Sequence, residues 1–236
     1  MKLVMFDMDG TLTDSVKLDD NCYVQAVERA LGLTHIVTDW DSYPHASSSG
    51  CLHEIVRRAR GHGPTPDEDR AVQRALLALL DDLAERQNKR TVEITGAAAS
   101  VQAVLDAGHA VAIASGDWEL TAHHKLTSAR IPFQKLPSAY CDVSHVRTEI
   151  MQTALVRARA HYGVLEFDRV IYVGDGPWDV KACRELAWPL IGIGHGDRGR
   201  RLRTLGVSHV LPHYEPLNHF MTALDTALVP IPSTIG

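Results

Sequence analysis

The fold of this chain is decided by the stretch Leu3-Val4-Met5-Phe6-Asp7-Met8-Asp9-Gly10-Thr11-Leu12-Thr13-Asp14-Ser15. It begins with an apolar run typical of a buried strand and continues into two carboxylates separated by one residue. A Gly-Thr turn that breaks the strand lets Asp7 and Asp9 converge on one small volume. Two carboxylates this close repel each other unless a proton or a cation lies between them. The stretch therefore predicts a site for a hard divalent cation, with Mg²⁺ as the candidate.

The same stretch resembles the first motif of the haloacid dehalogenase superfamily of phosphohydrolases, Asp-x-Asp-Gly-Thr-Leu-x-Asp-Ser after a hydrophobic strand, and matches it at every position. The resemblance implies that Asp7 attacks phosphorus and forms an aspartyl-phosphate, while Asp9 acts as general acid and then as general base. It also implies that Gly10 and Thr11 lie at the phosphate. A simpler interpretation is that the two acids only cap a turn.

The composition is that of an ordinary globular protein. The chain has 236 residues, of which 45% are apolar and 22% are charged, unlike a largely disordered chain. This length favours one core domain that carries a smaller insertion. The formal net charge of -5 predicts no general affinity for nucleic acid, so an anionic substrate has to be attracted by local cations.

The sequence shows no targeting signal. It opens directly into the apolar run, without a basic segment before a longer apolar one, and no apolar run is long enough to span a membrane. We therefore expect a cytoplasmic protein with no membrane partner, present as a monomer or a small homo-oligomer. Its four cysteines lie far apart and form no Cys-x-x-Cys pair, which predicts free thiols.

Residues 16–90 have the pattern of helices only. Apolar residues recur there at three- and four-residue spacing, and Gly32 and Gly61 stop the first two helices. The sequence Thr65-Pro66-Asp67-Glu68 is a capping box that starts a third helix. The superfamily that the first motif resembles places a helical cap domain at this point, after the first strand. The expected division is therefore a catalytic core of residues 1–15 and 91–236, with a cap domain of residues 16–90.

Beyond residue 90, short apolar strands alternate with amphipathic helices. The predicted strands are Ala110–Ala114, Ala139–Val143, Arg169–Val173, Leu190–Ile193 and His209–Leu211. The predicted helices between them are Ala98–Ala107, Trp118–Arg130, Thr148–Tyr162 and Trp178–Ala187. This alternation predicts an α/β fold with a doubly wound, Rossmann-like parallel sheet, covered by helices on both faces.

Two more motifs follow predicted strands, and in a doubly wound sheet ligands bind beyond the carboxyl ends of the strands. Ser115 and Gly116 end one strand just before a helix, where a hydroxyl and N–H groups form a small anion cradle. They match the superfamily's second motif, which implies a phosphate contact. A serine at such a place also serves as a helix N-cap, so this motif is weak by itself.

The stronger signal is Gly174-Asp175-Gly176-Pro177-Trp178-Asp179, which matches the superfamily's fourth motif, Gly-Asp-x-x-x-Asp. The resemblance implies that Asp175 completes the oxygen shell of Mg²⁺, together with the Asp7 carboxylate and the Asp9 backbone carbonyl. Asp179 is then a supporting residue that binds a metal-bound water or orients its neighbours. The alternative is an acidic first helical turn without a ligand.

The third motif of the superfamily is a lysine, often followed by proline, and this chain lacks it. Arg147 stands at the equivalent place, so it is the candidate cation for the phosphate, with Lys125 as the alternative. Arginine binds phosphate bidentately but cannot donate a proton in catalysis as an acid. Further along, Arg198, Arg200, Arg201 and Arg203 form a cluster that we interpret as a solvated helix face rather than a phosphate site.

The function that the resemblance implies is a phosphatase of the phosphoglycolate phosphatase-like group, acting on a small-molecule phosphomonoester such as phosphoglycolate or a sugar phosphate. The turn of residues 42–50, with His45 and three serines, is the candidate to contact the leaving group. Two alternatives stay open. One is a phosphomutase of the beta-phosphoglucomutase type, and the other is a phosphate-binding module that has lost turnover with the third-motif lysine.

Overall fold

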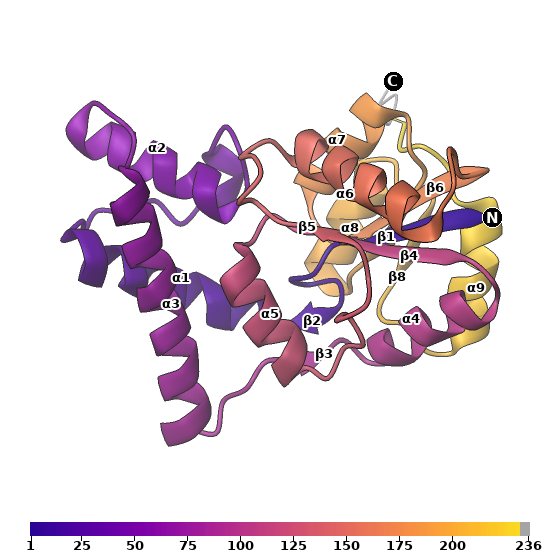
Figure 1. Ribbon diagram of the computed structural model, residues 1–236, viewed down its shortest axis with the longest axis horizontal. Helices are drawn as coiled ribbons and strands as arrows, with labels where there is room; N and C mark the ends of the chain where they lie inside the picture. The colour runs from indigo at the N-terminus through magenta and orange to yellow at the C-terminus, as the bar shows by residue number, and fades with distance from the viewer. Residues whose placement is uncertain (232–236) are drawn as a thin grey trace.

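The apolar strand at the start of the chain, β1 (Lys2–Phe6), forms the centre of a six-stranded sheet (Figure 1). The order of the strands is β5-β4-β1-β6-β7-β8, and all neighbours are parallel. The other strands are β4 (Ala110–Ala114), β5 (Ser138–Ala139), β6 (Arg169–Gly174), β7 (Leu190–Ile193) and β8 (His209–Leu211). Because β1 lies between β4 and β6, the residues that follow these three strands meet at one edge of the sheet. The predicted α/β fold with a parallel sheet is confirmed. The structure describes residues 1–231, except the side chain of Lys17.

Alternate side chains of the strands face two hydrophobic layers, each covered by helices. The first layer contains Leu3 and Met5 together with helices α6 (Arg147–Tyr162) and α7 (Pro177–Leu186). The second contains Val4 and Phe6 together with helices α4 (Ala97–Asp106) and α9 (Leu217–Thr226). Burial of both faces explains why the strands read as continuous apolar runs in the sequence.

Residues 16–90, the helical segment, lie to one side of the sheet (Figure 1). They form α1 (Val16–Leu31), the short 3-10 helix η1 (Trp40–Ser42), α2 (Ser48–Arg60) and α3 (Pro66–Arg86). The predicted capping box of α3 is confirmed, because the Thr65 N–H donates to Glu68 Oε2 (2.8 Å) and the Glu68 N–H donates to Thr65 Oγ1 (3.3 Å). Helix α3 packs against both α1 and α5 (Glu119–Ser128), which joins the helical segment to the rest of the protein.

A short antiparallel pair flanks the helical segment and was not predicted. Strand β2 (Thr13–Asp14) pairs with β3 (Val92–Glu93), so the two ends of the segment lie side by side. Two residues are too few to show an alternating pattern, and therefore periodicity could not reveal these strands. The pair lies at the ends of the predicted cap domain, whose boundaries stay a prediction, and residues 232–236 of the predicted core lie outside the described residues.

The strand predicted over Ala139–Val143 was wrong after its first residue. Strand β5 ends at Ala139 because the chain then turns: the Cys141 N–H donates to the Asp117 carbonyl (2.9 Å) and the Val143 N–H to the Tyr140 carbonyl (3.1 Å). These backbone groups serve turns rather than a sheet ladder, a choice that apolar residues alone do not indicate.

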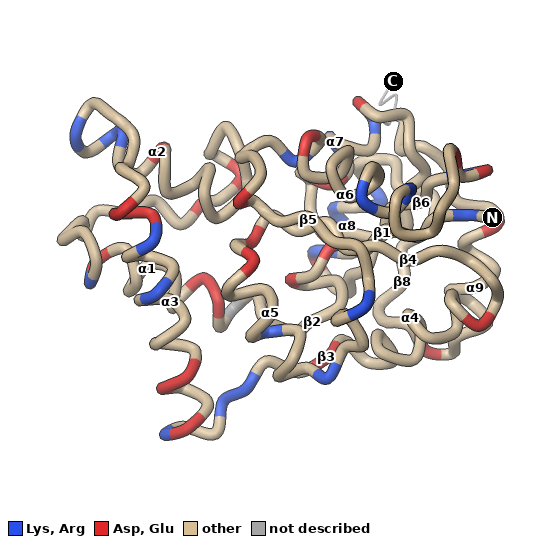
Figure 2. Tube along the Cα trace, in the orientation of Figure 1, with Lys and Arg blue, Asp and Glu red and all other residues tan. Residues whose placement is uncertain are grey.

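Charged residues of both signs are interspersed over the helical segment and the sheet side alike (Figure 2). All four cysteines are buried free thiols, as predicted from their spacing. Among residues 1–231, no helix combines the length and the apolar character that crossing a membrane requires.

Candidate active site

Three carboxylates meet at the edge of the sheet where β1 and β6 end. Asp7 follows β1, and Asp175 and Asp179 follow β6. One oxygen of each lies within 4.8 Å of one oxygen of each of the others, and all three residues are buried. Asp7 and Asp175 also line a cavity of about 480 Å³ between the sheet and the helical segment. The structure therefore brings Asp7 together with Asp175, which lies 168 residues further along the chain.

Glycines allow this close approach. Gly10 has a φ of +74°, and a Cβ added there would collide with the Asp175 carboxylate. A Cβ at Gly174 would lie 2.5 Å from Asp179 Oδ2. Glycine has no Cβ, so the backbone at both places comes into contact with a carboxylate. The two glycines of the first and fourth motifs thus have a packing role in the site.

Asp179 is held by the start of helix α7. Its Oδ2 atom accepts hydrogen bonds from the N–H groups of Asp175 and Gly176, both 3.0 Å long. Its Oδ1 atom has no hydrogen-bond partner and lies 3.7 Å from Arg147 Nη1. Asp179 was predicted as a supporting residue, and the structure places its carboxylate in the acidic cluster itself.

Burial makes the charge of these acids costly. Desolvation raises the pKa of Asp7 to about 7, in spite of the opposing effect of the Arg147 guanidinium and with smaller contributions from the nearby Asp179 and Asp9. Burial also raises the pKa of Asp175 well above its usual value, against the lowering effect of Arg198. The cluster is therefore short of positive charge, since neighbouring acids disfavour each other's ionised forms.

Arg147 supplies the cation nearest to Asp7. It is the first residue of α6, and its Nη1 atom lies 3.1 Å from Asp7 Oδ1. Its Nη2 atom donates to the Ala46 carbonyl in the helical segment (3.3 Å). A Cβ at Gly116 would lie 2.9 Å from Nη2, so Gly116 leaves room for the guanidinium. Of the two candidates for the third-motif cation, the structure places Arg147 against Asp7 and Asp179.

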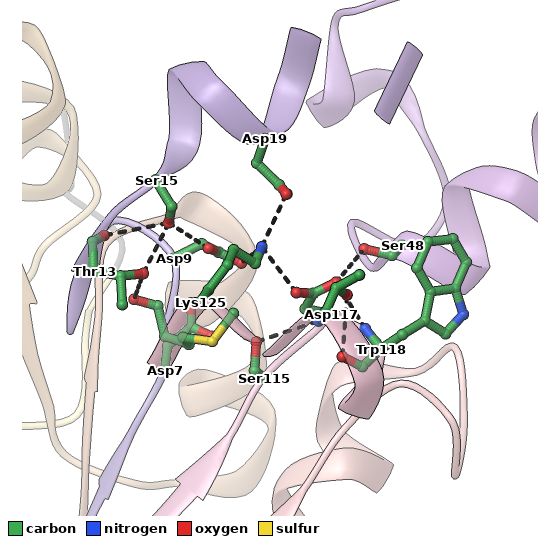
Figure 3. Close-up of polar contacts among 12 residues, drawn as sticks. Asp7, Asp9, Thr13, Ser15, Asp19, Ser48, Ser115, Asp117, Trp118 and Lys125 are labelled. Carbon is green, nitrogen blue, oxygen red and sulfur yellow. Dashed lines mark hydrogen bonds and ion pairs between the residues drawn. The ribbon is translucent and has the colours of Figure 1, made fainter. Parts of the chain in front are cut away.

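The alternative candidate, Lys125, contacts the other acid of the first motif (Figure 3). Its Nζ atom donates to Asp9 Oδ2 (2.9 Å), while the Ser15 hydroxyl donates to Asp9 Oδ1. The Asp9 carboxylate is not one of the three clustered carboxylates, and the predicted metal contact of Asp9 rests on its backbone carbonyl alone. Arg147 thus contacts Asp7, and Lys125 contacts Asp9.

Of the four other residues predicted to contact phosphate, two line the cavity and two do not. Ser115 and Gly116 line the cavity at the end of β4. Gly10 and Thr11 do not line it: the Gly10 N–H donates to the Thr13 carbonyl (2.7 Å), and Thr11 is fully buried. The turn after β1 uses its own backbone groups to close on itself, and so the structure does not bring these two residues to the cavity.

The arginines of the cluster are exposed, as the interpretation as a solvated helix face predicts, but two of them also line the cavity. Arg198 and Arg201, on α8 (Gly196–Thr204), line the cavity. Arg198 Nη1 lies 2.9 Å from Asp175 Oδ2, and Arg201 Nη2 lies 2.5 Å from Asp41 Oδ2 in η1. The missed signal was their position after β7, the strand beside β6, with a spacing of three residues on one helix face.

The residues of the cluster fit a hard divalent cation. Asp175 Oδ1 and Asp179 Oδ1 are buried without a hydrogen-bond partner, and buried oxygens without partners are rare in folded proteins. Carboxylate oxygens are the ligands that Mg²⁺ prefers. Asp7, Asp175 and Asp179 are therefore the side chains that would hold such an ion, and its charge would relieve the repulsion among them.

Metal binding is expected to stabilise the protein. At about 100 times its Kd, Mg²⁺ stabilises the folded state by about 2.7 kcal/mol, which corresponds to a rise in Tm of about 5 °C or more. Asp175→Asn is expected to lose this rise, because it removes one charged ligand. Thermal unfolding with Mg²⁺ and with EDTA measures both. The control is Asp197→Asn, at an acid that lines the cavity mouth with a side chain 96% exposed. An equal rise in all three proteins would contradict the site.

Comparison with known proteins agrees with the architecture. A hydrolase from Pseudomonas syringae shares the fold with a TM-score of 0.68 and 18% sequence identity, and the match covers 94% of this chain and 99% of that one. CbbY from Rhodobacter sphaeroides in complex with phosphate has a TM-score of 0.61 and 17% identity, covering 91% of this chain and 95% of that one. A predicted phosphoglycolate phosphatase from Haemophilus somnus has a TM-score of 0.57 and 13% identity, covering 94% of this chain and 98% of that one. No curated protein sequence matches the chain.

The family is shown by the sequence itself. The model of the family described as haloacid dehalogenase-like hydrolase matches residues 1–186, which is most of the chain and includes all four motif regions. This match agrees with the buried acids, the two basic residues and the parallel sheet described above. The chain belongs to the haloacid dehalogenase-like hydrolases.

Proposed function

We propose that the protein is a Mg²⁺-dependent phosphatase that hydrolyses a small phosphomonoester through an aspartyl-phosphate on Asp7. The observation that carries this proposal is the arrangement of the first motif. Asp7 lies buried in the acidic cluster beside Arg147, while Asp9, two residues on, faces the same cavity in a different set of contacts. This arrangement supports the proposal that one carboxylate attacks phosphorus and the other transfers a proton.

In the first step, an oxygen of Asp7 attacks phosphorus in line and the bond from phosphorus to the leaving oxygen breaks. Asp9 donates a proton to that oxygen, so the product leaves as an alcohol. Arg147 interacts with the charge on the phosphoryl oxygens, and Ser115 and Gly116 lie at the cavity wall beside them. Mg²⁺, when bound by the acidic cluster, offsets negative charge on the transferring group.

In the second step, water attacks phosphorus and releases Asp7 as a free carboxylate. Asp9, now ionised, takes a proton from that water, and inorganic phosphate leaves. Asp9 changes from acid to base between the two steps, so its carboxylate has to stay close to the same oxygen position in both. The bonds of Asp9 to Lys125 and Ser15 hold its carboxylate in one orientation, which supports this double role.

The cavity suits a small substrate. Its volume of about 480 Å³ lies in the range of small-molecule sites. The helical segment contributes Tyr23, Trp40, Ser47 and Ser48 to its wall, opposite the acids of the sheet. Phosphoglycolate and sugar phosphates are the substrate classes that we propose to test first.

Two hydroxyl groups of the turn of residues 42–50 are bonded to other parts of the chain. Ser47 Oγ donates to the His145 carbonyl (2.9 Å), and Ser49 Oγ donates to the Cys141 carbonyl (3.2 Å). These bonds fasten the turn to the segment before α6. His45 and Ser49 do not line the cavity, whereas Ser47 and Ser48 do.

A phosphate-release screen tests the proposed function. Purified protein is incubated with p-nitrophenyl phosphate, sugar phosphates, phosphoglycolate, phosphoserine and nucleotides, with Mg²⁺ or with EDTA. We expect release of inorganic phosphate that requires Mg²⁺, with a kcat of about 1 per second or more on the best substrate. Two outcomes contradict the proposal. Isomerisation of a sugar phosphate that depends on a bisphosphate activator indicates a mutase, and phosphate binding without release indicates a silent module.

A further inference from the structure

A fully buried lysine, Lys125, contacts the proposed acid of the reaction, Asp9. Lys125, on α5, has a side chain with 0% exposure, and its Nζ atom is paired with three carboxylates (Figure 3). The distances are 2.9 Å to Asp9 Oδ2, 2.9 Å to Asp19 Oδ1 and 2.8 Å to Asp117 Oδ2. The contact with Asp9 is a hydrogen bond, whereas those with Asp19 and Asp117 are ion pairs. The ammonium is therefore surrounded by three carboxylates and donates its hydrogen bond to Asp9.

The three carboxylates come from three separate parts of the chain. Asp9 lies in the turn after β1, Asp19 lies on α1 of the helical segment, and Asp117 lies in the loop after β4. Asp117 also accepts a bond through Oδ1 from Ser48 Oγ at the start of α2 (3.3 Å). Lys125 thus connects the proposed acid of the reaction to two helices of the segment that covers the cavity.

The cluster formed by Lys125 and its three carboxylates depends on the lysine for its positive charge. Three buried or half-buried carboxylates face one ammonium, so removal of Lys125 leaves negative charge without compensation. The Asp9 carboxylate keeps its orientation through Lys125 on one oxygen and Ser15 on the other. Without the lysine, repulsion from Asp19 and Asp117 acts on an acid held by a single hydrogen bond.

Arg147 does not share this role. The guanidinium is engaged by Asp7, Asp179 and the Ala46 carbonyl. The charge that stabilises the nucleophile and the charge that orients the acid therefore come from different helices, α6 and α5.

We propose that Lys125 is a positioning residue, which orients Asp9 for proton transfer and couples that orientation to the packing of α1 through Asp19. This inference rests on the proposed function, because it assigns a role within the same reaction. Lys125 therefore affects the proton transfers made by Asp9, to the leaving oxygen and from the attacking water, and does not touch the phosphoryl group.

The dependence on the leaving group tests this role. An alkyl phosphate has a poor leaving group that needs a proton, whereas p-nitrophenyl phosphate leaves as a stabilised anion and needs little help. General acid catalysis contributes about 10² to 10⁴ in rate, so Lys125→Gln is expected to lower kcat/KM, which reports only the steps up to release of the leaving group, about 100-fold on an alkyl phosphate and less than about tenfold on p-nitrophenyl phosphate. Asp9→Asn is expected to show the same division between the substrates. The control is Lys181→Gln, at an exposed lysine on α7.

A purely structural role gives a different result. If Lys125→Gln lowers kcat/KM equally on both substrates, or on neither, the positioning role is wrong. Circular dichroism and thermal unfolding show whether the variant folds. If it does not fold, Asp19→Asn decides, because it keeps Lys125 and reduces the negative charge of the cluster. That variant is expected to lower kcat/KM about tenfold on the alkyl phosphate and to spare p-nitrophenyl phosphate; an equal effect on both overturns the proposal.

The wild type separates this inference from the proposed function. If it releases no phosphate from any ester, the proposed function has failed and the positioning role falls with it. If it hydrolyses both substrate types and the variants lose both equally, only the role of Lys125 is refuted. A measured KM that stays within about twofold of the wild type in the folded variants supports an effect on the chemical step rather than on binding.

Discussion

Asp7→Asn is expected to abolish phosphate release, with a loss of about 10⁴-fold or more in kcat. The amide cannot form the aspartyl-phosphate, and the other groups of the site cannot replace the missing nucleophile. A coupled assay for inorganic phosphate with Mg²⁺ measures this loss. Asp197→Asn serves again as the control, since that acid is exposed at the cavity mouth and makes no contact with Asp7. Activity above about 1% of the wild type would refute the role of Asp7 as nucleophile.

The same substitution is expected to change how stability depends on pH. Because the folded-state pKa of Asp7 is raised from 3.8 to about 7, the native state binds more protons than the unfolded state between these values. The contribution of Asp7 to stability therefore falls as the pH rises through this window. Urea unfolding in EDTA is expected to show Asp7→Asn gaining on the wild type from about pH 4 to about pH 7. A constant difference across this range would contradict the buried, protonated acid.

Arg147→Ala is expected to impair both stability and turnover. The substitution leaves Asp7 and Asp179 without the cation that lies between them, and breaking a buried ion pair from one side costs about 3 to 5 kcal/mol. It also removes positive charge from the phosphoryl group, a loss of about 10³-fold or more in kcat by analogy with other phosphate-binding arginines. Urea unfolding and phosphate release measure the two effects.

Arg147→Lys distinguishes charge from geometry at this position. The family's third motif is a lysine, so an ammonium is expected to restore most of the stability and part of the turnover, although it loses the bond to the Ala46 carbonyl. The control on the same helix is Arg157→Ala, at an arginine that donates to the Ser138 carbonyl near the surface. If Arg147→Ala were as stable and as active as this control, the assignment of the third-motif cation would be wrong.

Arg147 and Lys125 are expected to have different roles in the reaction. Both side chains are charged and buried in ion pairs, and both were candidates for one role from the sequence. Arg147 lies against Asp7, the proposed nucleophile, and Lys125 against Asp9, the proposed acid, so their loss is expected to have different effects. We expect Arg147→Ala to lower kcat on every substrate, and Lys125→Gln to lower kcat/KM mainly on substrates with poor leaving groups.

Local patterns in the sequence determined the fold class and the positions of the acids. Apolar runs followed by Asp7 and by Asp175 predicted strands with acids at their carboxyl ends, because alternating and continuous burial are local properties of a strand. The capping box at Thr65 and the stop at Gly32 were equally readable, since helix ends are satisfied by nearby residues. The family resemblance then named the chemistry that acids in this place perform.

The tertiary structure alone decided which charges meet. Lys125 pairs with an acid 116 residues away, and Arg198 pairs with Asp175 although its helix reads as solvated from the sequence. Such pairs depend on the order of strands in the sheet and on how α1, α5 and α8 pack above its edge, and no local pattern of residues encodes that distance. A basic residue has the same appearance in the sequence whether water or a buried carboxylate surrounds it, because its partner is selected only when the chain folds.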